Sequence, residues 1–342
     1  MSNFIEKSKT LQYQLQNNYS ATFIEVCAGC GGLSSGFIEA GFKPLLLNDI
    51  DKTCCETLRL NHPNIDVVCD SMVNLDLTPY KDKVDLLMGG LSCQSFSISG
   101  KRRGLKDERG NLMLEFSRLI SETNPKIFLI ENVKGLLNHN KGKTLATIIA
   151  NFPKNYRVNY QLLNAVDYEV PQKRERVFIV GVRDNIKEKF LFPSKIDKKI
   201  LLKDVLPKCP NTDGGYTYST EKAKIMHQVP QGGCWVDLPD KVAKKYMKDS
   251  YYSEGGRRGI LKRLNMLESS LTLTTSPMQK QTERCHPLED RPLNVREYAR
   301  IQTFPDTYNF AGSIAAKYRQ IGNAVPIRLA YHVAKEVMKI IS

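Results

Sequence analysis

Short apolar runs alternate with amphipathic stretches over the first half of the chain. Apolar runs rich in β-branched residues occupy residues 22–27, 44–48, 66–69, 84–88, 126–130, 157–163 and 176–182. Between them, apolar positions recur at helical spacing over residues 32–40, 52–60, 110–122 and 143–151. Strands that alternate with helices are typical of a parallel sheet covered on both faces. The pattern therefore predicts an α/β fold with a doubly wound sheet.

The pattern changes after Val182. Residues 184–290 are rich in Lys, Gly, Pro and Tyr, with little helical period beyond 240–248. Helical spacing returns at 294–302, and residues 326–341 form an amphipathic closing helix with Pro326 near its start. We therefore predict two domains. Residues 1–186 and 308–342 form the first, and residues 187–307 form a second domain that is smaller and irregular.

Composition narrows the choice of partner and compartment. The formal net charge of +14 favours a polyanionic partner, without distinguishing DNA from RNA. No run approaches the roughly 18 apolar residues that a membrane span needs, and the first residues lack an apolar signal core. We therefore expect a cytoplasmic monomer that has no contact with a membrane and whose nine cysteines are reduced.

A glycine-rich turn follows the first predicted strand. Gly29, Gly31 and Gly32 would let the backbone approach a ligand, and the helix that follows favours electronegative groups at its start. Asp49 ends the second strand about twenty residues later, where an acid can bind both hydroxyls of a ribose. Asp49 could instead cap the helix at 52–60, although Asp51 fits that role better. These residues alone fit a dinucleotide as well as S-adenosylmethionine.

Four cysteines near this turn raise the alternative of a zinc or redox site. Cys27 and Cys30 have the spacing of a metal-binding pair, and Cys54 and Cys55 follow in the next helix. However, a thiol within a strand and a thiol in a glycine turn point poorly towards one tetrahedral ion. We therefore predict no metal.

A second constellation carries candidate chemistry. Cys93 lies in a glycine-flanked turn after the strand at 84–88, and Glu131 ends the strand at 126–130. In a parallel sheet both residues would project from the carboxyl edge, where such folds bind ligands. Taken alone, each is more often a buried structural cysteine or a surface carboxylate. Together, an exposed thiolate and a carboxyl that can hold a proton suit addition to an electron-poor ring.

These motifs, in this order, resemble those of the DNA (cytosine-5)-methyltransferases. The resemblance runs from about residue 20 to the end of the chain, through the Cys93 turn and residues 23–34, 48–51, 70–71, 131–133, 172–176, 291–297, 301–305 and 320–326. It implies the Rossmann-like fold of S-adenosylmethionine-dependent methyltransferases. The first predicted domain would then be the catalytic and cofactor-binding domain, and the second would recognise the target.

The resemblance also implies a set of cofactor-binding residues. Asn323 belongs to a motif that folds back against the glycine turn, so that both ends of the chain build one pocket. Asp70 would accept the adenine amino group. Cys27 departs from the family, which usually has an aromatic residue there, and Ile50 replaces an aromatic or apolar one. The implied S-adenosylmethionine contacts are Cys27, Gly29, Cys30, Gly31, Gly32, Asp49, Ile50, Asp70, Ser71, Ser92, Asn323 and Ala324.

The implied chemistry begins with addition of the Cys93 thiolate to C6 of a cytosine, which activates C5 for methylation. Glu131 would hold the N3/N4 edge and protonate N3. Arg174 and Arg176, on one side of a strand, could contact the cytosine O2 and the target phosphate. Surface charge is the alternative for this pair. The family has proline where this chain has Ser92, which is less rigid and removes no reacting group.

Base flipping is implied because a cytosine inside a duplex cannot be reached. Residues 95–107 suit a lid that closes over a phosphate backbone. Lys262 and Arg263, like Arg257 and Arg258, are candidates for reading guanine edges, with phosphate contact an equal alternative. The sequence does not disclose the target. The predicted DNA contacts are Gln94, Ser95, Ser97, Lys101, Arg102, Arg103, Gln172, Arg257, Arg258 and Thr272.

The predicted function is methylation of cytosine C5 in a specific duplex DNA sequence, protecting the host from a cognate restriction endonuclease. A transfer-RNA cytosine-5 methyltransferase is the first alternative, but the Cys-Phe-Thr tripeptide of that branch is absent from the sequence. A catalytically silent DNA-binding protein on the same scaffold would predict loss of Cys93, Glu131 or Arg176, and all three are present. A nicotinamide oxidoreductase would have no use for these three residues.

Overall fold

The computed structural model describes residues 20–91, 112–252 and 257–341. Seven strands form the main sheet, in the order β3-β2-β1-β4-β5-β8-β6. Each lies within a few residues of its predicted position, so these predictions are confirmed. The strands are β1 (Ala21–Val26), β2 (Phe42–Asp49), β3 (Asp66–Cys69), β4 (Leu86–Gly90), β5 (Ile127–Val133), β6 (Tyr156–Asn164) and β8 (Glu175–Arg183).

The sheet is mixed rather than wholly parallel. Strands β1 to β5 pair in parallel, but β8 runs antiparallel to both β5 and β6. The prediction of a parallel sheet was wrong for this strand, because an apolar run carries no information on strand direction. The reversal has a functional consequence: Val133 near the end of β5 pairs with Arg176 near the start of β8. The first residues of β8 therefore lie at the edge where the parallel strands end.

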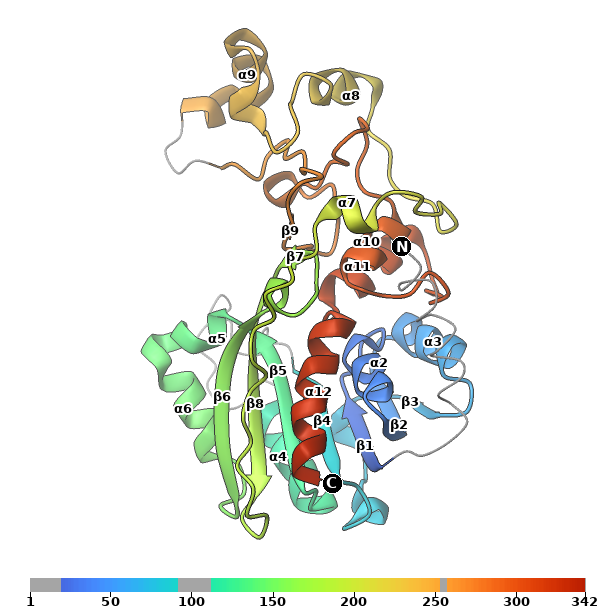
Figure 1. The fold of residues 1–342 in the computed structure, drawn as a ribbon, viewed down its shortest axis with the longest axis vertical. Helices are drawn as coiled ribbons and strands as arrows, with labels where there is room; N and C mark the ends of the chain where they lie inside the picture. The colour runs from blue at the N-terminus through green and yellow to red at the C-terminus, as the bar shows by residue number, and fades with distance from the viewer. Residues whose placement is uncertain (1–19, 92–111, 253–256, 342) are drawn as a thin grey trace.

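Helices cover both faces of the sheet, as predicted (Figure 1). Alternate strand residues point to opposite faces: Phe23 packs with α2 and α12 on one face, and Ile24 packs with α4 and α6 on the other. This arrangement confirms the doubly wound fold. The helices of these two layers, together with those that flank them, are α2 (Gly32–Glu39), α3 (Lys52–Asn61), α4 (Leu112–Thr123), α5 (Gly135–Asn138), α6 (Lys143–Ala150) and α12 (Ile327–Ile341).

Helix α12 packs closely along α2. A Cβ atom on Gly36 of α2 would lie 2.5 Å from the Ala330 Cβ and 2.6 Å from the Ile327 carbonyl oxygen of α12. Only a glycine allows the two backbones to approach this closely. Arg328 then fixes α12 by donating to Glu39 at 2.6 Å and by pairing with Glu169. The closing helix therefore belongs to the same layer as the first helix of the sheet.

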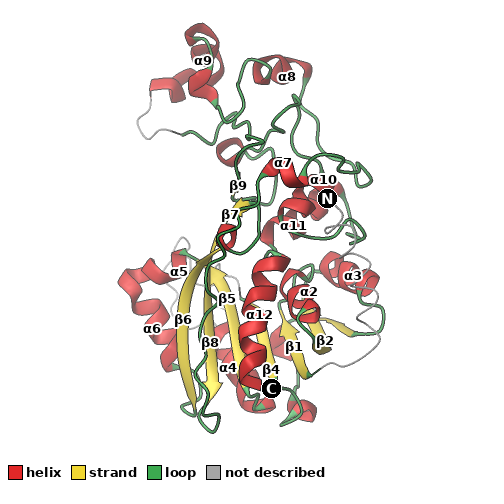
Figure 2. Ribbon diagram, in the orientation of Figure 1, coloured by secondary structure: helices red, strands yellow, loops and turns green. Residues whose placement is uncertain are grey.

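The remainder of the chain is mostly irregular and lies at one end of the sheet (Figure 2). Its two-stranded sheet pairs β7 (Gln172–Lys173) in parallel with β9 (Ser270–Leu271). Helices α8 and α9 lie far from the main sheet, and α10 and α11 lie between (Figure 1). The helices are α7 (Leu202–Val205), α8 (Thr220–Met226), α9 (Asp240–Met247), α10 (Val295–Ile301) and α11 (Ile314–Asn323).

A hydrophobic core joins segments on both sides of residue 307. Leu202 of α7 and Leu273 pack in one cluster with Tyr298 of α10 and Tyr318 of α11. The domain boundary placed at 307/308 therefore falls inside a shared core. The division into two domains stays a prediction.

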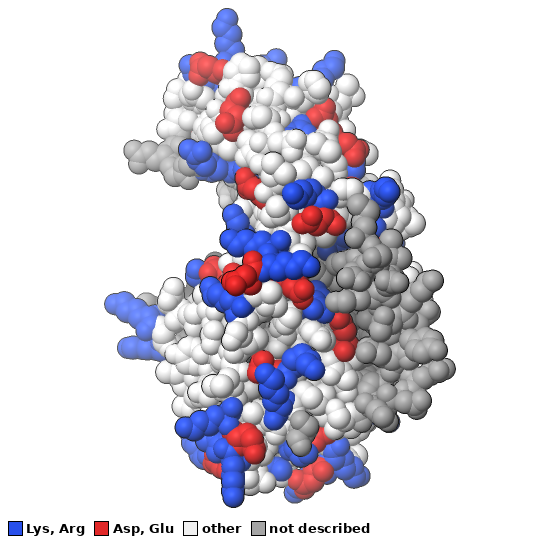
Figure 3. Space-filling model, viewed as in Figure 1, with Lys and Arg blue, Asp and Glu red and all other residues white. Residues whose placement is uncertain are grey.

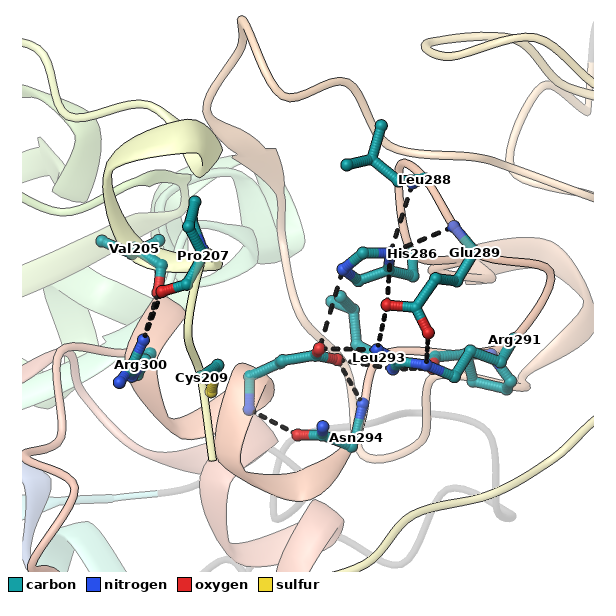
Figure 4. Close-up of polar contacts among 12 residues, drawn as sticks. Val205, Pro207, Cys209, His286, Leu288, Glu289, Arg291, Leu293, Asn294 and Arg300 are labelled. Carbon is teal, nitrogen blue, oxygen red and sulfur yellow. Dashed lines mark hydrogen bonds and ion pairs between the residues drawn. The ribbon is translucent and has the colours of Figure 1, made fainter. Parts of the chain in front are cut away.

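Polar contacts fix the start of α10 (Figure 4). Asn294 and Glu297 form a capping box, in which the Asn294 Oδ1 accepts from the Glu297 N at 2.8 Å and the Glu297 carboxylate accepts from the Asn294 N at 2.7 Å. Arg291 donates two hydrogen bonds of 2.8 Å to the same carboxylate. Arg300 then joins α10 to α7 by donating to the Val205 carbonyl oxygen at 2.8 Å. The 291–297 motif therefore anchors the irregular region to the shared core.

Candidate active site

A cavity of about 830 Å³ opens at the carboxyl ends of the parallel strands. Its wall is built from the turn after β1, the acidic turn after β2, the segment after β3, the ends of β4 and β5, the start of β8, and residues 319–325. A volume of this size is typical of small-molecule sites. The cavity lies at the sheet edge that the sequence predicted.

Most of the predicted cofactor residues line this cavity. Cys30 and Gly31 do not line it, and Ser92 lies outside the described residues. The predicted residues that line it are Cys27, Gly29, Gly32, Asp49, Ile50, Asp70, Ser71, Asn323 and Ala324.

Asp49 holds the glycine turn in place. The turn needs left-handed backbone at Cys27 (φ 52°), Gly29 (φ 56°) and Gly31 (φ 83°). Asp49 Oδ2 accepts from the Gly29 N at 2.7 Å, and its Oδ1 accepts from the Asp51 N at 2.8 Å. Burial raises the pKa of Asp49, and these backbone hydrogen bonds oppose the shift. Asp51, as predicted, is the cap of α3, since its side chain accepts from the Thr53 N at 2.8 Å.

The C-terminal segment supports the same turn from behind. Tyr308 donates its hydroxyl to the Cys30 carbonyl oxygen at 2.7 Å, and the Cys30 thiol lies 3.4 Å from the Gln320 carbonyl oxygen. A Cβ atom on Gly32 would lie only 2.3 Å from the Val325 carbonyl oxygen. Both ends of the chain therefore build one pocket, which confirms the prediction made for the motif that contains Asn323.

Glu131 and Arg176 form an ion pair in this cavity. The Arg176 Nε lies 2.8 Å from the Glu131 Oε1, and the Glu131 residue is only 8% exposed. Burial raises the pKa of Glu131, while the positive charges of Arg176 and Arg174 oppose the shift. Glu131 is therefore held in one orientation in an environment that favours a bound proton. The antiparallel direction of β8 brings this pair together.

Glu25 and Asn132 are among the cavity residues that were not predicted from the sequence. Asn132 donates its side-chain amide to the Leu91 carbonyl oxygen at 2.7 Å, two residues before Cys93. Glu25, at 1% exposed, has a carboxylate oxygen without a hydrogen-bond partner among the described residues. Burial raises the pKa of Glu25 to about 8, although Ser34 opposes the shift. The available signal was an acidic residue near the end of the first strand, four residues before Gly29.

A comparison with protein families identifies the family of this chain. The family model described as C-5 cytosine-specific DNA methylase matches residues 21–339. The chain belongs to this family. The methyltransferase is 46% identical to the type II methyltransferase M.Eco47II of Escherichia coli, over 99% of this chain and 84% of that one. It is 47% identical to the type II methyltransferase M.PspPI of a Psychrobacter strain, over 94% of this chain and 80% of the other.

A solved structure has the same fold. It is a prophage-encoded Escherichia coli protein described as a candidate DNA modification methyltransferase, with a TM-score of 0.71 and 25% identity. The match covers 94% of this methyltransferase and 99% of that protein. The Rossmann-like methyltransferase fold predicted from the sequence is therefore confirmed.

Several predicted residues of the methyltransferase lie between the described residues 91 and 112. Their roles stay predictions, including that of Cys93 as the nucleophile. The described residues that flank this segment, Leu91 and Leu112, both line the cavity. The residues concerned are Ser92, Cys93, Gln94, Ser95, Ser97, Lys101, Arg102 and Arg103.

The placement of Gln172 and Arg174 differs from their predicted contacts with DNA and cytosine. Both residues are 0% exposed, and neither lines the cavity. Arg174 is the single residue between β7 and β8. Its guanidinium donates to the carbonyl oxygens of Leu273 at 3.0 Å and Gly322 at 2.9 Å. Gln172 binds the backbone N–H of Leu273 at 2.9 Å. The alternation of side chains along one strand predicted that Arg174 and Arg176 point to the same face. The break between β7 and β8 instead leaves Arg174 buried among backbone groups and Arg176 in the cavity.

The predicted residues of the irregular region fall into two groups. Arg257 and Arg258 are exposed, as a nucleic-acid contact requires. Arg263, in contrast, is 5% exposed and donates to the Val229 carbonyl oxygen at 2.8 Å, which leaves its side chain poorly placed for either of its predicted contacts, guanine edges or phosphate. Thr272 is partly buried and donates its hydroxyl to the Lys173 carbonyl oxygen at 2.7 Å.

The cysteines of the described segments are all free thiols. Within those segments, no group of His, Cys, Asp and Glu could hold a metal ion. Burial raises the pKa of Cys27 to about 12, so this thiol stays protonated beside the cavity. Nor is any helix of residues 20–91, 112–252 or 257–341 both long and apolar enough to cross a membrane.

Proposed function

We propose that the methyltransferase transfers a methyl group from S-adenosylmethionine to C5 of a cytosine flipped out of a specific duplex DNA sequence. The observation that carries this proposal is that Asp49 and the Glu131–Arg176 pair line the same cavity. A cofactor and a flipped base bound there would meet. Because its relatives are type II methyltransferases, we propose that it protects host DNA from a cognate restriction endonuclease.

The cavity fits S-adenosylmethionine. Asp49 would bind the ribose hydroxyls, and Ile50, which is 72% exposed, would cover the adenine face. Asp70 would accept from the adenine amino group. The free carboxylate oxygen of Glu25 would face the positively charged methionine end. When bound, S-adenosylmethionine supplies an electrophilic methyl group.

The chain's own residues would then activate the cytosine. The Cys93 thiolate forms a bond to C6, and Glu131 delivers its proton to N3, so that the ring gains an enamine and C5 becomes nucleophilic. Arg176, held against Glu131, would contact the cytosine O2. After methylation, a water molecule takes the C5 proton, the bond between C6 and sulfur breaks, and N3 returns its proton to Glu131, which restores the thiolate, the aromatic ring and the acid.

The duplex would lie in the hollow between the sheet-bearing part and the part that carries α8 and α9, where Lys and Arg side chains gather (Figure 3). Exposed Arg257 and Arg258 lie in the second part. We propose that residues 187–307 recognise the target and that residues 1–186 and 308–342 carry out the chemistry. The protein would act as a monomer, and its pairing with the endonuclease would be functional rather than physical.

The experiment is a covalent trap. Fluorine at C5 cannot leave as a cation, so a duplex with 5-fluorocytosine at the target should hold the enzyme after one methyl transfer. We expect a denaturation-resistant band that requires S-adenosylmethionine. Cys93→Ala should abolish the band while DNA binding remains, and Cys209→Ala, which changes a thiol outside the cavity, should keep it.

A second experiment with the same enzyme identifies the target sequence and the class of substrate. Tritiated methyl transfer onto duplex DNA and onto total transfer RNA, with bisulfite sequencing of the DNA, identifies both. An adduct that survives in Cys93→Ala would refute the nucleophile. Methylation of transfer RNA alone would refute the proposed substrate.

A further inference from the structure

A buried polar cluster lies where the irregular region meets the main sheet. Gln172, Arg174 and Gln302 are each 0% exposed, and their side chains bind the backbone of two separate segments. The segments are the exit from β9 and the end of α11, and Gln172 and Arg174 come from the junction of β7 and β8. None of the three side chains lines the active-site cavity. The cluster is therefore outside the catalytic machinery described above.

Arg174 contacts both segments directly. Its Nη1 donates to the Leu273 carbonyl oxygen at 3.0 Å, two residues after β9. Its Nη2 donates to the carbonyl oxygens of Gly322 at 2.9 Å and Asn323 at 3.3 Å. Asn323 lines the cofactor wall of the cavity. One guanidinium thus joins the segment that leaves the proposed recognition region to the segment that supports the cofactor.

The two glutamines join the same segments. The Gln172 side chain accepts from the Leu273 N at 2.9 Å and donates to the Gln302 Oε1 at 2.9 Å. Gln302 in turn donates to the carbonyl oxygens of Ile321 at 2.7 Å and Ala324 at 3.1 Å. Because the links are hydrogen bonds between buried side chains and backbone, a shift of residues 271–273 must displace residues 321–324 or break these hydrogen bonds.

Stability alone does not account for an arginine at this position. Burial, with the nearby charge of Arg176, lowers the pKa of Arg174 to about 9, although Glu131 opposes the shift. Its Nε has no partner among the described residues. Well-packed apolar residues often replace buried charges without loss of stability. A guanidinium, however, holds several donors in a fixed planar fork, and two of the Arg174 nitrogens donate to carbonyl groups of two different segments.

We infer that Arg174 is a positioning residue that couples target recognition to the cofactor pocket. Duplex DNA that orders residues 271–273 would, through Arg174, fix Gly322 and Asn323 against the cofactor. DNA and cofactor should therefore strengthen each other's binding. This inference rests on the proposed function, because it requires both ligands to bind the protein.

Arg284 provides a matched control. It is also a buried arginine, at 5% exposed, with an Nε that lacks a partner among the described residues. Its Nη2 donates to the Thr272 carbonyl oxygen at 2.7 Å, on the same exit segment, and its Nη1 donates to the Glu283 carbonyl oxygen at 2.7 Å. It has no hydrogen bond to residues 321–324 in the described structure. Arg284→Lys should thus cost stability without affecting the coupling.

The experiment measures the affinity for S-adenosylhomocysteine, which cannot react, with and without saturating target duplex. Binding of each ligand alone by the parent protein tests the proposed function, and the ratio of the two affinities tests the coupling. We expect the duplex to raise the affinity by at least about fivefold in the parent protein, the lower end of typical coupling. The ratio should fall below about twofold in Arg174→Lys and stay at the parent value in Arg284→Lys.

Hydrogen exchange of the parent protein tests the same coupling without a variant, should Arg174→Lys fail to fold. Addition of duplex alone should slow exchange of the amides of residues 320–325. Three results would overturn the inference: a parent ratio of one, an equal loss of coupling in both variants, or unchanged exchange at 320–325. A protein that binds neither ligand would instead refute the proposed function.

Discussion

Replacing Glu131 by glutamine separates the chemistry of this residue from its place in the fold. Glutamine keeps the shape and one acceptor oxygen, so the Arg176 Nε, 2.8 Å from the carboxylate, retains a partner. Removing one charge from a buried ion pair typically costs about 3–5 kcal/mol of stability. Because glutamine keeps an oxygen beside Arg176, the exchange should cost less than that. Relief of the burial penalty on the carboxylate offsets part of that cost.

The expected loss in rate is larger. Glu131→Gln removes the proton donor for N3. A positioned acid typically raises the reaction rate by about 10²- to 10⁴-fold. That range corresponds to roughly 3–5 kcal/mol in the barrier. The variant should therefore stay folded, bind duplex DNA with nearly the parent affinity, and lose its rate of methyl transfer.

Single-turnover transfer of a tritiated methyl group, with enzyme in excess over duplex, is the suitable assay because product release does not enter it. Glu175→Gln is the control, since Glu175 is next in the chain to Arg176 but pairs with the exposed Lys134 at 2.9 Å. We expect the control to stay within about twofold of the parent. Glu131→Gln with more than about a tenth of the parent rate would refute the assignment of Glu131 as the acid.

The pH dependence gives a second test of the same assignment. Because burial raises the pKa of Glu131, its protonated fraction falls as the pH rises through that raised value. The parent rate should decline along this limb, and the Glu131→Gln rate should lack it. Parallel profiles for the two proteins would show that another group donates the proton.

Three further predictions concern the cofactor wall. Gly32→Ala should weaken S-adenosylhomocysteine binding and cost about 1–3 kcal/mol of stability, because the added Cβ would lie 2.3 Å from the Val325 carbonyl oxygen. Calorimetry that finds the affinity and the stability unchanged would contradict this contact. Glu25→Gln should gain stability over the parent as the pH rises from 5 to 9, because the pKa of Glu25 is raised from 4.5 to about 8 in the fold and each unit is worth about 1.4 kcal/mol. Denaturant titrations in which the free energies of unfolding of the parent and of Glu25→Gln change equally between the two pH values would exclude this buried acid as the cause. Asp49→Ala should cost about 1.5–3 kcal/mol of cofactor affinity with DNA affinity unchanged, and unchanged cofactor affinity in calorimetry would reduce Asp49 to an anchor of the glycine turn.

Local sequence signals were sufficient for the elements of the sheet. The strands and the helices at residues 32–40, 52–60 and 143–151 follow from apolar spacing, and the cap at Asp51 follows from its position before a helix. Strand direction did not follow, because β8 is as apolar as its parallel neighbours. Nor did helix α11, whose apolar positions pack against the shared core rather than against the sheet.

The candidate site was predictable where a motif fixes a residue to a strand end, as for Asp49 and Glu131. It was not predictable where the role depends on tertiary neighbours. Arg174 and Arg176 are two residues apart, a spacing that places both on one face of a strand. Backbone carbonyl groups nevertheless enclose Arg174, whereas Arg176 faces the cavity. Arg263 likewise lies in a basic cluster of the sequence but is buried.

The support of the glycine turn by Tyr308 and Val325 has a consequence for synthesis of the protein. The turn after β1 leaves the ribosome well before Tyr308 and Val325, which support it in the folded protein. A nascent chain that ends before Tyr308 has a complete sheet without a finished cofactor wall. We therefore expect a chain truncated before Tyr308 to bind the cofactor more weakly than the full chain, because the glycine turn lacks this support.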